Sequence, residues 1–277
     1  MPACFRPIFI LTLRAAQLRR LLLLFCISFL SGIAASAAQP VRACAANLEY
    51  PPYLYAENQG GRHDLAGLSL DILQYALRKN GKSMVRVQRL PWLRCLKLVE
   101  LGEMDLVLNV PTAQIESSPF LISEPYAIVH SVYFVSSANA AKGIRIGSYE
   151  DLSKYRICGL LGNRYDAYGI DTAKVDTGSD DYLSLINKVK AGHCDLFIEK
   201  REIVESLSRR NAALKAALNS PQLMQFSLPE DSPIGLHYAI SRNMPGARLL
   251  LKQLDASISI LRRNGKIKIW VRRHLLK

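Results

Sequence analysis

Residues 91–110, PWLRCLKLVELGEMDLVLNV, decide the fold class of this chain. Pro91 suits an early helical position and Gly102 is a typical helix stop, so the stretch predicts a helix through Leu101. The apolar run DLVLNV at 105–110 has the length of a buried strand. A helix that leads directly into a buried strand is typical of an α/β fold.

The same alternation extends on both sides of this stretch. Before it, the pattern predicts a strand over 41–48, a helix over 68–79 and a strand over 84–88, which completes a βαβαβ order and a largely parallel sheet. After it, the pattern predicts strands over 155–161, 195–198 and 236–240. It also predicts a helical turn over 148–153, a helix over 181–191, a helix that follows the strand over 195–198 and ends at Leu207, and two long terminal helices separated by Gly265. With 277 residues, the chain accommodates two such α/β units of about 100 residues each.

Composition and charge exclude several classes of protein. With 49% hydrophobic and 21% charged residues, the chain is neither disordered nor collagen-like. The formal net charge of +13 is a feature of many proteins that bind nucleic acid. The sequence contains no helix-turn-helix, OB-type or zinc pattern, however, and much of the charge sits on the amphipathic terminal helix over 262–277. We therefore expect no nucleic-acid partner.

The first 37 residues have the pattern of a secretory signal peptide. Four Arg precede the uncharged run LLLLFCISFLSGIAA at 21–35, and Ala35-Ser36-Ala37 matches the A-x-A pattern of a cleavage site. The run is shorter than the ~20 residues of a transmembrane helix, although an uncleaved anchor is the alternative. This pattern predicts cleavage near Ala37 and export to the periplasm.

Four cysteines follow this leader: Cys44, Cys95, Cys158 and Cys194. An even number in an oxidising compartment predicts two disulfides, with buried free thiols as the alternative. No Cys-x-x-Cys pair or His-Cys cluster occurs, so we expect no metal site and no cofactor.

Six short elements occur in a specific order and spacing. They are Tyr50-Pro51-Pro52-Tyr53, Gly67-Leu68-Ser69-Leu70-Asp71, Gly102-Glu103-Met104-Asp105-Leu106-Val107, Ser123-Glu124-Pro125-Tyr126, Gly192-His193-Cys194-Asp195 and Tyr238-Ala239-Ile240-Ser241. Together they resemble family 3 of the bacterial extracellular solute-binding proteins, the polar amino-acid type. Each element is weak alone, but the resemblance covers essentially the whole chain after the leader.

The resemblance implies a bilobed periplasmic-binding-protein fold of type II. Two α/β lobes would be joined by a two-strand hinge, with lobe 1 formed by 40–133 plus 230–277 and lobe 2 by 134–229. Such a fold binds its ligand in the cleft between the lobes, and closure buries the ligand. Four cysteines allow three connectivities, and the pairing Cys44–Cys95 with Cys158–Cys194 keeps each bridge within one lobe.

The resemblance also implies ligand-binding residues at the ends of strands. Tyr53 and Tyr55 follow the first strand, and Trp92 falls where family members place an aromatic residue that stacks on the ligand. Thr112 falls at the family's position for a hydroxyl group near the ligand. Arg94, in the first turn of a helix, is a candidate for gripping a carboxylate. The alternatives are core packing for Trp92, a turn cap for Thr112 and a solvated helix position for Arg94.

Two positions depart from the family's pattern. The Arg that usually clamps the α-carboxylate of the ligand would fall at Glu116 or Ser117. The acidic group that usually holds the α-amino group falls at Lys200, with Glu199 one residue earlier as a possible replacement. Arg164 is a candidate for the missing Arg and is otherwise an exposed loop cation. Because an unpaired buried charge is costly, either the ligand is not a standard α-amino acid or other residues hold its ends.

These features favour a monomeric periplasmic protein that captures a small polar solute, an amino acid or a related compound, for an ABC permease in the inner membrane. An enzyme on the same fold, such as a dehydratase, is the first alternative. An enzyme would need an acid or base group beside its substrate, and none of the five His forms an obvious pair with a nucleophile. Glu116 and Glu199 are the one pair of carboxylates that could act in this way across the cleft. We expect no catalytic residues. A free-standing ligand sensor that docks on a receptor is the second alternative.

Overall fold

The structure, a computed structural model, describes residues 39–59, 62–81, 84–112, 119–228 and 233–276. By its internal contacts the chain divides into Met1–Gln39 and Pro40–Lys277, and the elements below belong to the second unit. The predicted leader at 1–37 lies outside the described residues. No helix in the described ranges is both long enough and apolar enough to cross a bilayer.

The larger sheet has six strands in the order β4-β1-β5-β13-β6, with β7 also paired to β13. Its strands are β1 (Val41–Ala46), β4 (Val85–Leu90), β5 (Leu106–Pro111), β6 (Leu121–Ile122), β7 (Ala127–Val129) and β13 (Ile234–Ile240). As the βαβαβ pattern predicts, β1 pairs in parallel with β4 and β5. β13 enters antiparallel to β5 from the far end of the chain, so the chain returns to this sheet after building a second one.

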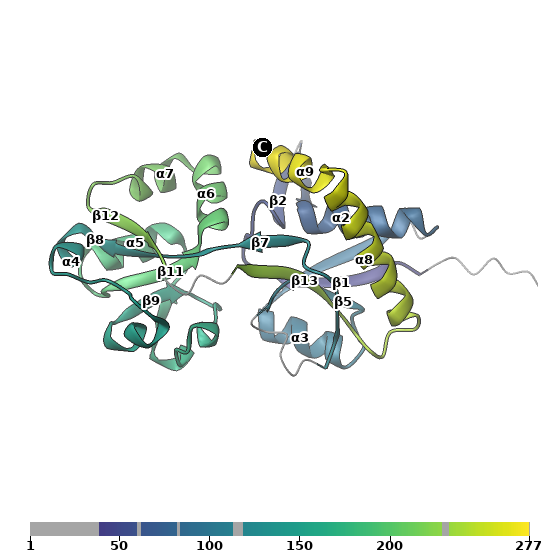
Figure 1. Cartoon of the computed structure of the whole chain (residues 1–277), viewed down its shortest axis with the longest axis horizontal. Coiled ribbons are helices and arrows are strands. Elements are labelled where there is room, and N and C mark those ends of the chain that lie inside the picture. The colour runs from purple at the N-terminus through teal and green to yellow at the C-terminus, as the bar shows by residue number, and fades with distance from the viewer. Residues whose placement is uncertain (1–38, 60–61, 82–83, 113–118, 229–232, 277) are drawn as a thin grey trace, which may run out of the picture. The chain divides into compact units, whose positions relative to one another are not determined.

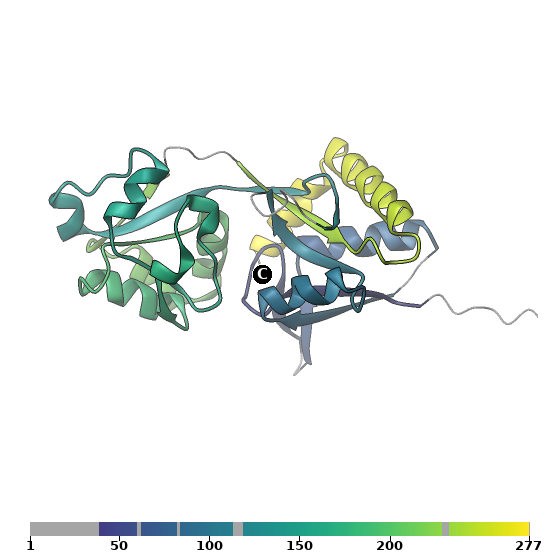
Figure 2. The ribbon, with the colours of Figure 1, turned by 90° about the horizontal axis from the view of Figure 1, so that it is seen from below.

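Helices cover both faces of the six-stranded sheet. α2 (Leu68–Lys79), α8 (Ala247–Arg263) and α9 (Lys266–Leu275) lie on one face and α3 (Trp92–Glu100) on the other (Figures 1 and 2). α2 turns Leu68, Ile72 and Leu73 inward at the spacing of an amphipathic helix. These side chains share one core with Leu254 and Ile258 of α8. The helices predicted over 68–79 and 91–101 are confirmed to within one residue at each end.

The second sheet has five strands in the order β10-β9-β11-β8-β12. Its strands are β8 (Ser131–Ser136), β9 (Ile157–Leu160), β10 (Asp176–Ser179), β11 (Leu196–Lys200) and β12 (Leu223–Ser227). α5 (Tyr182–Lys190), α6 (Arg201–Arg210) and α7 (Ala212–Leu218) contribute Leu185, Val204 and Leu214 to one core, and α4 (Ser137–Ala141) contributes to another. Because β10, β9 and β11 run parallel, this sheet repeats the strand–helix order of the first.

Several elements were not visible in the sequence pattern. β2 (Tyr55–Gln59) and β3 (Arg62–Ala66) form an antiparallel hairpin between the predicted strand over 41–48 and the predicted helix over 68–79. β2 reads YAENQ and β10 reads DTGS, and neither has the apolar alternation that marks a strand. These short polar strands form through backbone pairing with a neighbour, which a local pattern does not reveal.

Each sheet is fastened by the same arginine–aspartate arrangement. Beside β5, the backbone N–H of Arg42 donates to Asp105 Oδ2 at 2.7 Å, and its guanidinium donates to Asp105 Oδ1 at 2.7 Å. The guanidinium also donates to the carbonyl of Gly102, the glycine of the turn, at 3.1 Å. Beside β11, Arg156 makes the same three contacts with Asp195 and the matching glycine, at 2.8, 2.9 and 3.0 Å. In both sheets the Gly-x-x-Asp turn therefore joins the end of a helix to the neighbouring parallel strand.

We expect Asp195→Asn to destabilise the protein at neutral pH more than at acid pH. Burial opposes ionisation of Asp195, but the hydrogen bonds from Arg156 outweigh burial and lower the pKa of this carboxyl. A carboxyl whose pKa is lower in the folded than in the unfolded state stabilises the fold above its unfolded pKa, and this contribution is lost as the pH falls through the folded pKa. Discounted for the exposed guanidinium, the loss at pH 7 is about 1–2 kcal/mol.

Urea denaturation at pH 7 and at several pH values below 4 measures this difference in the free energy of unfolding. Asp64→Asn, at an exposed position of β3, is the matched control. Two results would contradict a stabilising role of the ionised Asp195. One is an equal loss of unfolding free energy for the two variants at pH 7. The other is a loss for Asp195→Asn that does not shrink as the pH falls below 3.8.

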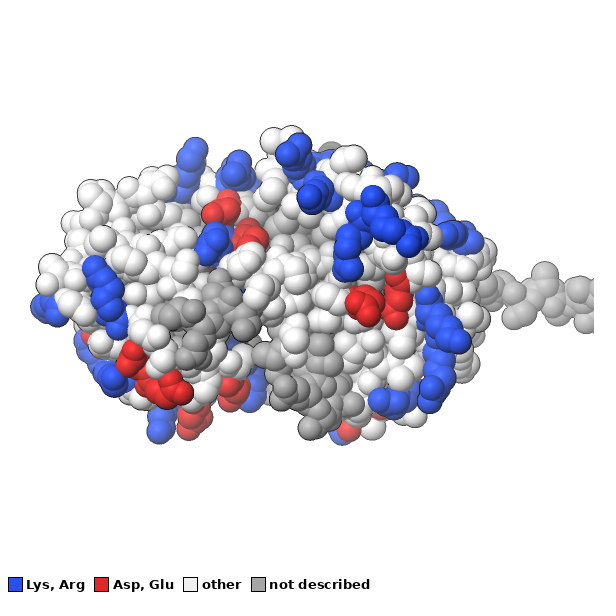
Figure 3. Space-filling model, in the orientation of Figure 1, with Lys and Arg blue, Asp and Glu red and all other residues white. Residues whose placement is uncertain are grey.

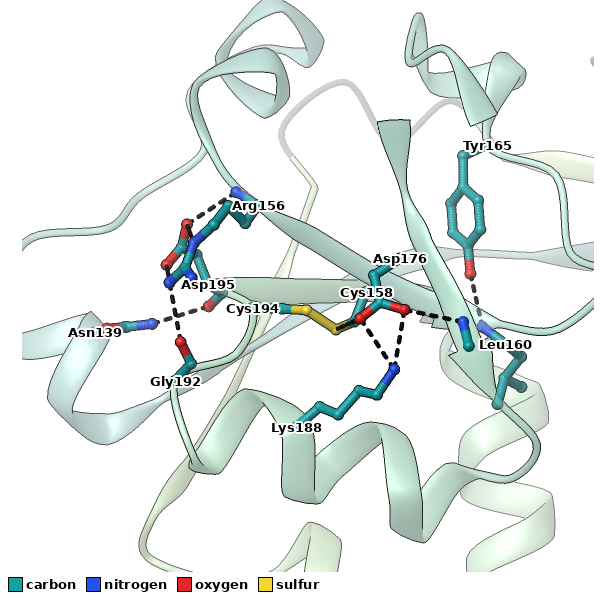
Figure 4. Close-up of a disulfide and its surroundings, with 11 residues drawn as sticks. Asn139, Arg156, Cys158, Leu160, Tyr165, Asp176, Lys188, Gly192, Cys194 and Asp195 are labelled. Carbon is teal, nitrogen blue, oxygen red and sulfur yellow. Dashed lines mark hydrogen bonds and ion pairs between the residues drawn. A yellow bond between two sulfur atoms is a disulfide. The ribbon is translucent and has the colours of Figure 1, made fainter. Parts of the chain in front are cut away.

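Both predicted disulfides are present. Cys44–Cys95 joins β1 to α3, and Cys158–Cys194 joins β9 to the turn before β11. Each bridge therefore stays within one sheet and its covering helix or turn, and the pairing predicted from the sequence is confirmed. Beside the second bridge, Lys188 of α5 pairs with a carboxylate of β10 at 2.9 Å (Figure 4).

The chain passes between the two sheets twice. β7 continues through His130 into β8, and the segment after β12 leads back to β13. α6 holds the first passage, because the His130 backbone N–H donates to Glu202 Oε2 at 2.9 Å and the His130 carbonyl accepts from Arg201 N at 2.8 Å. Residues 229–232 of the second passage lie outside the described residues. The passages occupy the places of the predicted hinge strands, and the hinge motion stays a prediction.

Much of the positive charge lies on the two terminal helices. On the face shown in Figure 3, Lys and Arg gather over α8 and α9. The exposed basic residues of these helices are Arg248, Lys252, Arg262, Arg263, Lys266, Lys268, Arg272 and Arg273. The other side of α9 packs Ile267, Trp270 and Val271 against the core. The amphipathic terminal helix with a solvated basic face is therefore confirmed.

Candidate functional site

A cavity of about 480 Å³ lies at the carboxyl ends of strands from both sheets, and we call it the pocket. From the six-stranded sheet it is lined by the ends of β1 and β5 and by residues that follow β1 and β4. From the five-stranded sheet it is lined by the loops after β9 and β10 and by the end of β11. Open α/β sheets bind ligands at this edge, and the volume fits a small solute.

The six-stranded sheet contributes an apolar and aromatic wall. Tyr50 and Leu54 lie in the loop after β1, where Tyr50 N donates to Leu54 O at 2.9 Å and closes a tight turn. Trp92 is the first residue of α3, so its half-buried indole stands beside the end of β4. Burial raises the pKa of Tyr50, so its hydroxyl stays neutral at physiological pH.

Asn109, at the end of β5, lines the pocket with an unusual backbone conformation. Its φ of 60° lies in the left-handed region, where no other non-glycine residue of the described ranges is found. The Tyr126 hydroxyl donates to Asn109 Oδ1 at 2.6 Å and accepts from Asn109 N at 3.0 Å. Such conformations cluster at binding sites and persist only where the surroundings hold them. Tyr126 supplies that hold and sets the position of Asn109 in the wall.

The five-stranded sheet contributes the loop after β9. Gly162 adopts a φ of 85°, which turns the chain away from the strand. Tyr165 folds back, and its hydroxyl accepts from Leu160 N at 3.3 Å (Figure 4). The hydroxyl lies so close to Gly159 that a Cβ there would approach it to 2.2 Å. The loop is therefore packed onto its own strand by an aromatic residue that also lines the pocket.

Glu199 is a buried carboxylate, 3% exposed, near the end of β11. It accepts hydrogen bonds from Asn163 Nδ2 at 2.9 Å and from the Lys200 backbone N–H at 3.1 Å, and the Tyr182 side chain adds a third. Burial raises the pKa of Glu199, while the charge of Lys200 and these three hydrogen bonds oppose the rise. Protein groups therefore occupy this carboxylate, which leaves it little capacity for a ligand.

Lys200 is the last residue of β11 and is half-buried. Its Nζ donates to the Tyr168 hydroxyl at 2.8 Å and lies 5.1 Å from the centre of the Tyr168 ring. Burial opposes its charge, yet the pKa of Lys200 is raised because neighbouring Tyr168 and Glu199 stabilise the charged form. The wall that β11 contributes to the pocket thus carries a lasting positive charge.

Four of the residues predicted from the sequence line the pocket: Trp92, Arg164, Glu199 and Lys200. They come from both sheets, as the resemblance implies, and their contacts with a ligand stay predictions. Arg164 is already ion-paired, with its Nη2 2.9 Å from Asp166 Oδ2. The candidate replacement for the missing Arg is therefore partly neutralised.

Three other predicted residues are not among the described residues that line the pocket. Tyr53 is 3% exposed and belongs to the core of the six-stranded sheet. Arg94 is exposed on α3. Thr112 Oγ1 accepts from Gly235 N at 2.8 Å and lies 3.1 Å from His237 Nε2, so it fastens the end of β5 to β13. The role of these three side chains in ligand binding stays a prediction.

Tyr55 belongs to a separate cluster. Its hydroxyl lies 2.9 Å from His274 Nδ1, and His274 Nε2 lies 2.7 Å from Asp71 Oδ2. The guanidinium of Arg210, from α6, lies 3.9 Å above the Tyr55 ring. Tyr55 therefore connects β2 with α9, α2 and α6 and does not line the pocket.

Sequence reasoning missed several residues that line the pocket. Glu116, also a candidate predicted from the sequence, lies outside the described residues. The missed polar and aromatic residues include Tyr50, Asn109, Asn163, Tyr165 and Asp180. Tyr50 stands in the quoted Tyr-Pro-Pro-Tyr element, and Asn163 follows a glycine after a strand, so both carried a signal. Asp180 follows β10, which has no apolar pattern, and its place at a strand end could not be seen.

The polar clusters outside the pocket are engaged within the fold. His130, His237 and His274 each bond to groups that do not line the pocket. Cys158, Asp176 and Cys194 bring possible metal ligands within 4.8 Å of one another. The two sulfur atoms are bonded to each other, however, so they offer no thiolate to a metal ion (Figure 4).

No model of a known protein family and no curated protein matches the chain, but it is similar to solved structures. AbpA, an amino acid ABC transporter substrate-binding protein from Streptococcus pneumoniae bound to L-arginine, is 17% identical, with a TM-score of 0.62 over 85% of this chain and 94% of that chain. A second structure, solved in a study of glutathione import via GshT and the cystine ABC importer TcyBC of Streptococcus mutans, is also 17% identical. Its TM-score is 0.64 over 86% of this chain and 95% of that chain.

A histidine kinase sensor domain with similarity to periplasmic binding proteins is also 17% identical, with a TM-score of 0.63 over 86% of this chain and 97% of that chain. These likenesses extend over almost the full length of each neighbour. The bilobed α/β fold predicted from the sequence is therefore confirmed: the chain has the fold of the periplasmic binding proteins.

Proposed function

We propose that the chain is a periplasmic solute-binding protein that captures a small solute in the pocket for uptake through an ABC permease. The observation that carries this proposal is the pocket of about 480 Å³, lined by strand ends from two sheets that the chain connects twice. Ligands of open α/β sheets bind at such an edge. Structural neighbours include amino acid ABC transporter substrate-binding proteins, one of them bound to L-arginine.

In this proposal the two lobes are 40–133 plus 230–277 and 134–229. The two passages between the sheets act as the hinge, and closure of the lobes buries the solute. The leader at 1–37 directs export, and two disulfides suit an oxidising compartment. The mature protein acts as a monomer that delivers its solute to the permease in the inner membrane.

The site favours binding over catalysis. A general acid or base must exchange protons near the working pH beside its substrate. The raised pKa of Lys200 keeps it charged, and the Glu199 carboxylate is enclosed by protein donors. We therefore propose a binding protein and not an enzyme.

A sensor accessory is the second candidate, because a histidine kinase sensor domain shares the fold. In that case the ligand-bound protein would dock on a receptor instead of a permease. Uptake of the radiolabelled solute by cells with and without the gene separates the two functions. Loss of uptake on deletion supports transport, and unchanged uptake supports sensing.

The two Trp of the chain allow a direct test of binding. Trp92 lines the pocket and Trp270 lies on α9. We expect a solute from a panel of amino acids, polyamines and organic acids to raise the melting temperature, because a ligand that binds the native state stabilises it. The same solute should change the fluorescence of Trp270→Phe, in which Trp92 is the remaining indole. Trp92→Ala should weaken binding about tenfold.

Leu93→Ala is the matched control, since Leu93 is 59% exposed beside Trp92 and does not line the pocket. Mass spectrometry of solute that co-purifies with the protein adds candidates to the panel. A panel that leaves the melting temperature unchanged throughout would contradict small-solute binding. Equal affinities of Trp92→Ala and Leu93→Ala would remove Trp92 from the site without affecting the proposed function.

A further inference from the structure

We propose that Lys200 is the anion-binding residue of the pocket, so that the solute is a carboxylic acid with an apolar, preferably aromatic, body. The inference rests on the proposed binding function and names its class of solute. It also reverses the charge expected from the resemblance, which places an acidic group at this position to hold an ammonium group of the ligand.

The ammonium group of Lys200 has donors to spare. It carries three N–H bonds. Within the described part of the chain, its hydrogen-bond partner is the Tyr168 hydroxyl at 2.8 Å, which in turn lies 3.0 Å from Ser131 Oγ. Tyr168 therefore fixes the direction of the side chain and leaves two N–H donors for another acceptor. A half-buried ammonium with open donors at a cavity wall fits an anionic ligand group.

Among the described residues, no acidic residue that lines the pocket forms an ion pair with the ammonium group of Lys200, although the nearby Glu199 stabilises its charge. Glu199 is engaged by Asn163 and by a backbone N–H, and no ion pair joins it to Lys200 Nζ among the described residues. Asp180 is exposed. Arg164, the other lining cation, is already paired with Asp166. Lys200 is thus a lining cation that no carboxylate of the described residues contacts directly.

The rest of the wall determines the body of the solute. Tyr50, Leu54 and Trp92 from one sheet and Leu161 and Tyr165 from the other present apolar and aromatic surface. Tyr50 and Lys200 both line the pocket, so the aromatic wall and the ammonium group border the same space. An acid with a flat or branched apolar body satisfies both parts of the lining.

Matched sets of compounds with one body and three head groups test the charge directly. The sets are phenylacetate, phenylacetamide and phenethylamine; indole-3-acetate, indole-3-acetamide and tryptamine; and 3-methylbutanoate, its amide and its amine. The wild-type protein is titrated by calorimetry and by melting temperature. We expect the acid of at least one set to bind, with affinity at least about tenfold above that of its amide, and the amines to give no shift.

Substitutions then assign the effect to one side chain. Lys200→Met keeps the length of the side chain and removes its charge, and we expect it to weaken binding of the acid at least about tenfold while binding of the amide changes little. Lys200→Arg keeps the charge and should retain binding of the acid. Lys215→Met, exposed on α7, is the matched control. Melting temperatures without ligand report whether each variant folds. If Lys200→Met does not fold, Lys200→Arg carries the test.

The outcomes separate the two proposals. Amines that bind better than acids, or acids that bind Lys200→Met as tightly as wild type, would overturn the role of Lys200 while the proposed binding function stands. No melting shift with these sets or with the amino acids, polyamines and organic acids of the wider panel would overturn the binding function, and the inference with it.

Discussion

Replacing Gly67 with alanine will lower the free energy of unfolding by about 3 kcal/mol or more. Gly67 precedes α2 with a φ of 141° and a ψ of 164°, a backbone region that is essentially closed to residues with a side chain. A Cβ at this position would also lie 2.2 Å from the carbonyl oxygen of Tyr53. Because that oxygen belongs to the backbone, the clash cannot be relieved by rotating a side chain.

This close approach holds the Tyr50–Leu54 turn on the first turn of α2. Leu68 N donates to Pro52 O at 3.0 Å, and Ser69 donates to Tyr53 O through both N, at 3.1 Å, and Oγ, at 2.7 Å. The turn carries two residues of the pocket wall. Any Gly67→Ala protein that folds should therefore also bind the solute more weakly, because Tyr50 and Leu54 will have moved.

Gly246→Ala is the matched control for this variant. Gly246 also precedes a helix at a positive φ, 78°, but a Cβ there would meet no atom of the described residues within 4 Å. It should lose about 1 kcal/mol from the backbone alone. Urea denaturation of both variants measures the difference, and Ser69→Ala gives a milder version if Gly67→Ala does not fold. Equal losses for the two glycines would show that the approach of Tyr53 O to Gly67 does not matter.

The sequence predicts the parallel strands β1, β4 and β5 of the first sheet and β9 and β11 of the second, because local patterns specify them. It does not predict β10, the third parallel strand of the second sheet, which lacks an apolar pattern. The run from Pro91 to Val110 contains a helix start, a helix stop and a buried strand within twenty residues, and each signal depends only on near neighbours. The bonds from Arg42 to Asp105 and from Arg156 to Asp195 carry no such signal. They join residues 63 and 39 positions apart, and only the fold brings them together.

The site was predicted less completely for a related physical reason. A resemblance places residues by their distance from a motif along the chain. Where a short strand connects the two, as between Asp195 and Lys200, the residue so placed lines the pocket. Tyr53 and Tyr55 are not among the described residues that line the pocket, and the turn at Tyr50–Leu54 directs Tyr50 to the pocket and Tyr53 into the core. The direction of a side chain in a tight turn depends on its docking partner, here α2, which spacing does not reveal.

Removing the Cys158–Cys194 bridge should lower stability by about 3–4 kcal/mol without weakening solute binding. The bridge closes a loop of 36 residues, and in the chain-entropy description its loss lets the unfolded state expand. Cys194 lies two residues before β11, at the amino end of that strand, whereas Glu199 and Lys200 line the pocket at the carboxyl end. The paired variant Cys158→Ala/Cys194→Ala should therefore keep its affinity for the solute at temperatures where it is folded.

Cys44→Ala/Cys95→Ala is the matched comparison, since its loop of 51 residues gives nearly the same entropy term. Urea denaturation measures the loss for each pair, and calorimetry measures affinity. Thiol titration of unreduced, denatured protein produced without residues 1–37 should detect no free cysteine. Four reactive thiols would contradict both bridges. A loss of affinity in the folded Cys158→Ala/Cys194→Ala protein would contradict this prediction and would mean that the amino end of β11 controls the pocket. In that case the pairing of β9 with β11 alone would be too weak to keep the carboxyl ends of both strands in place.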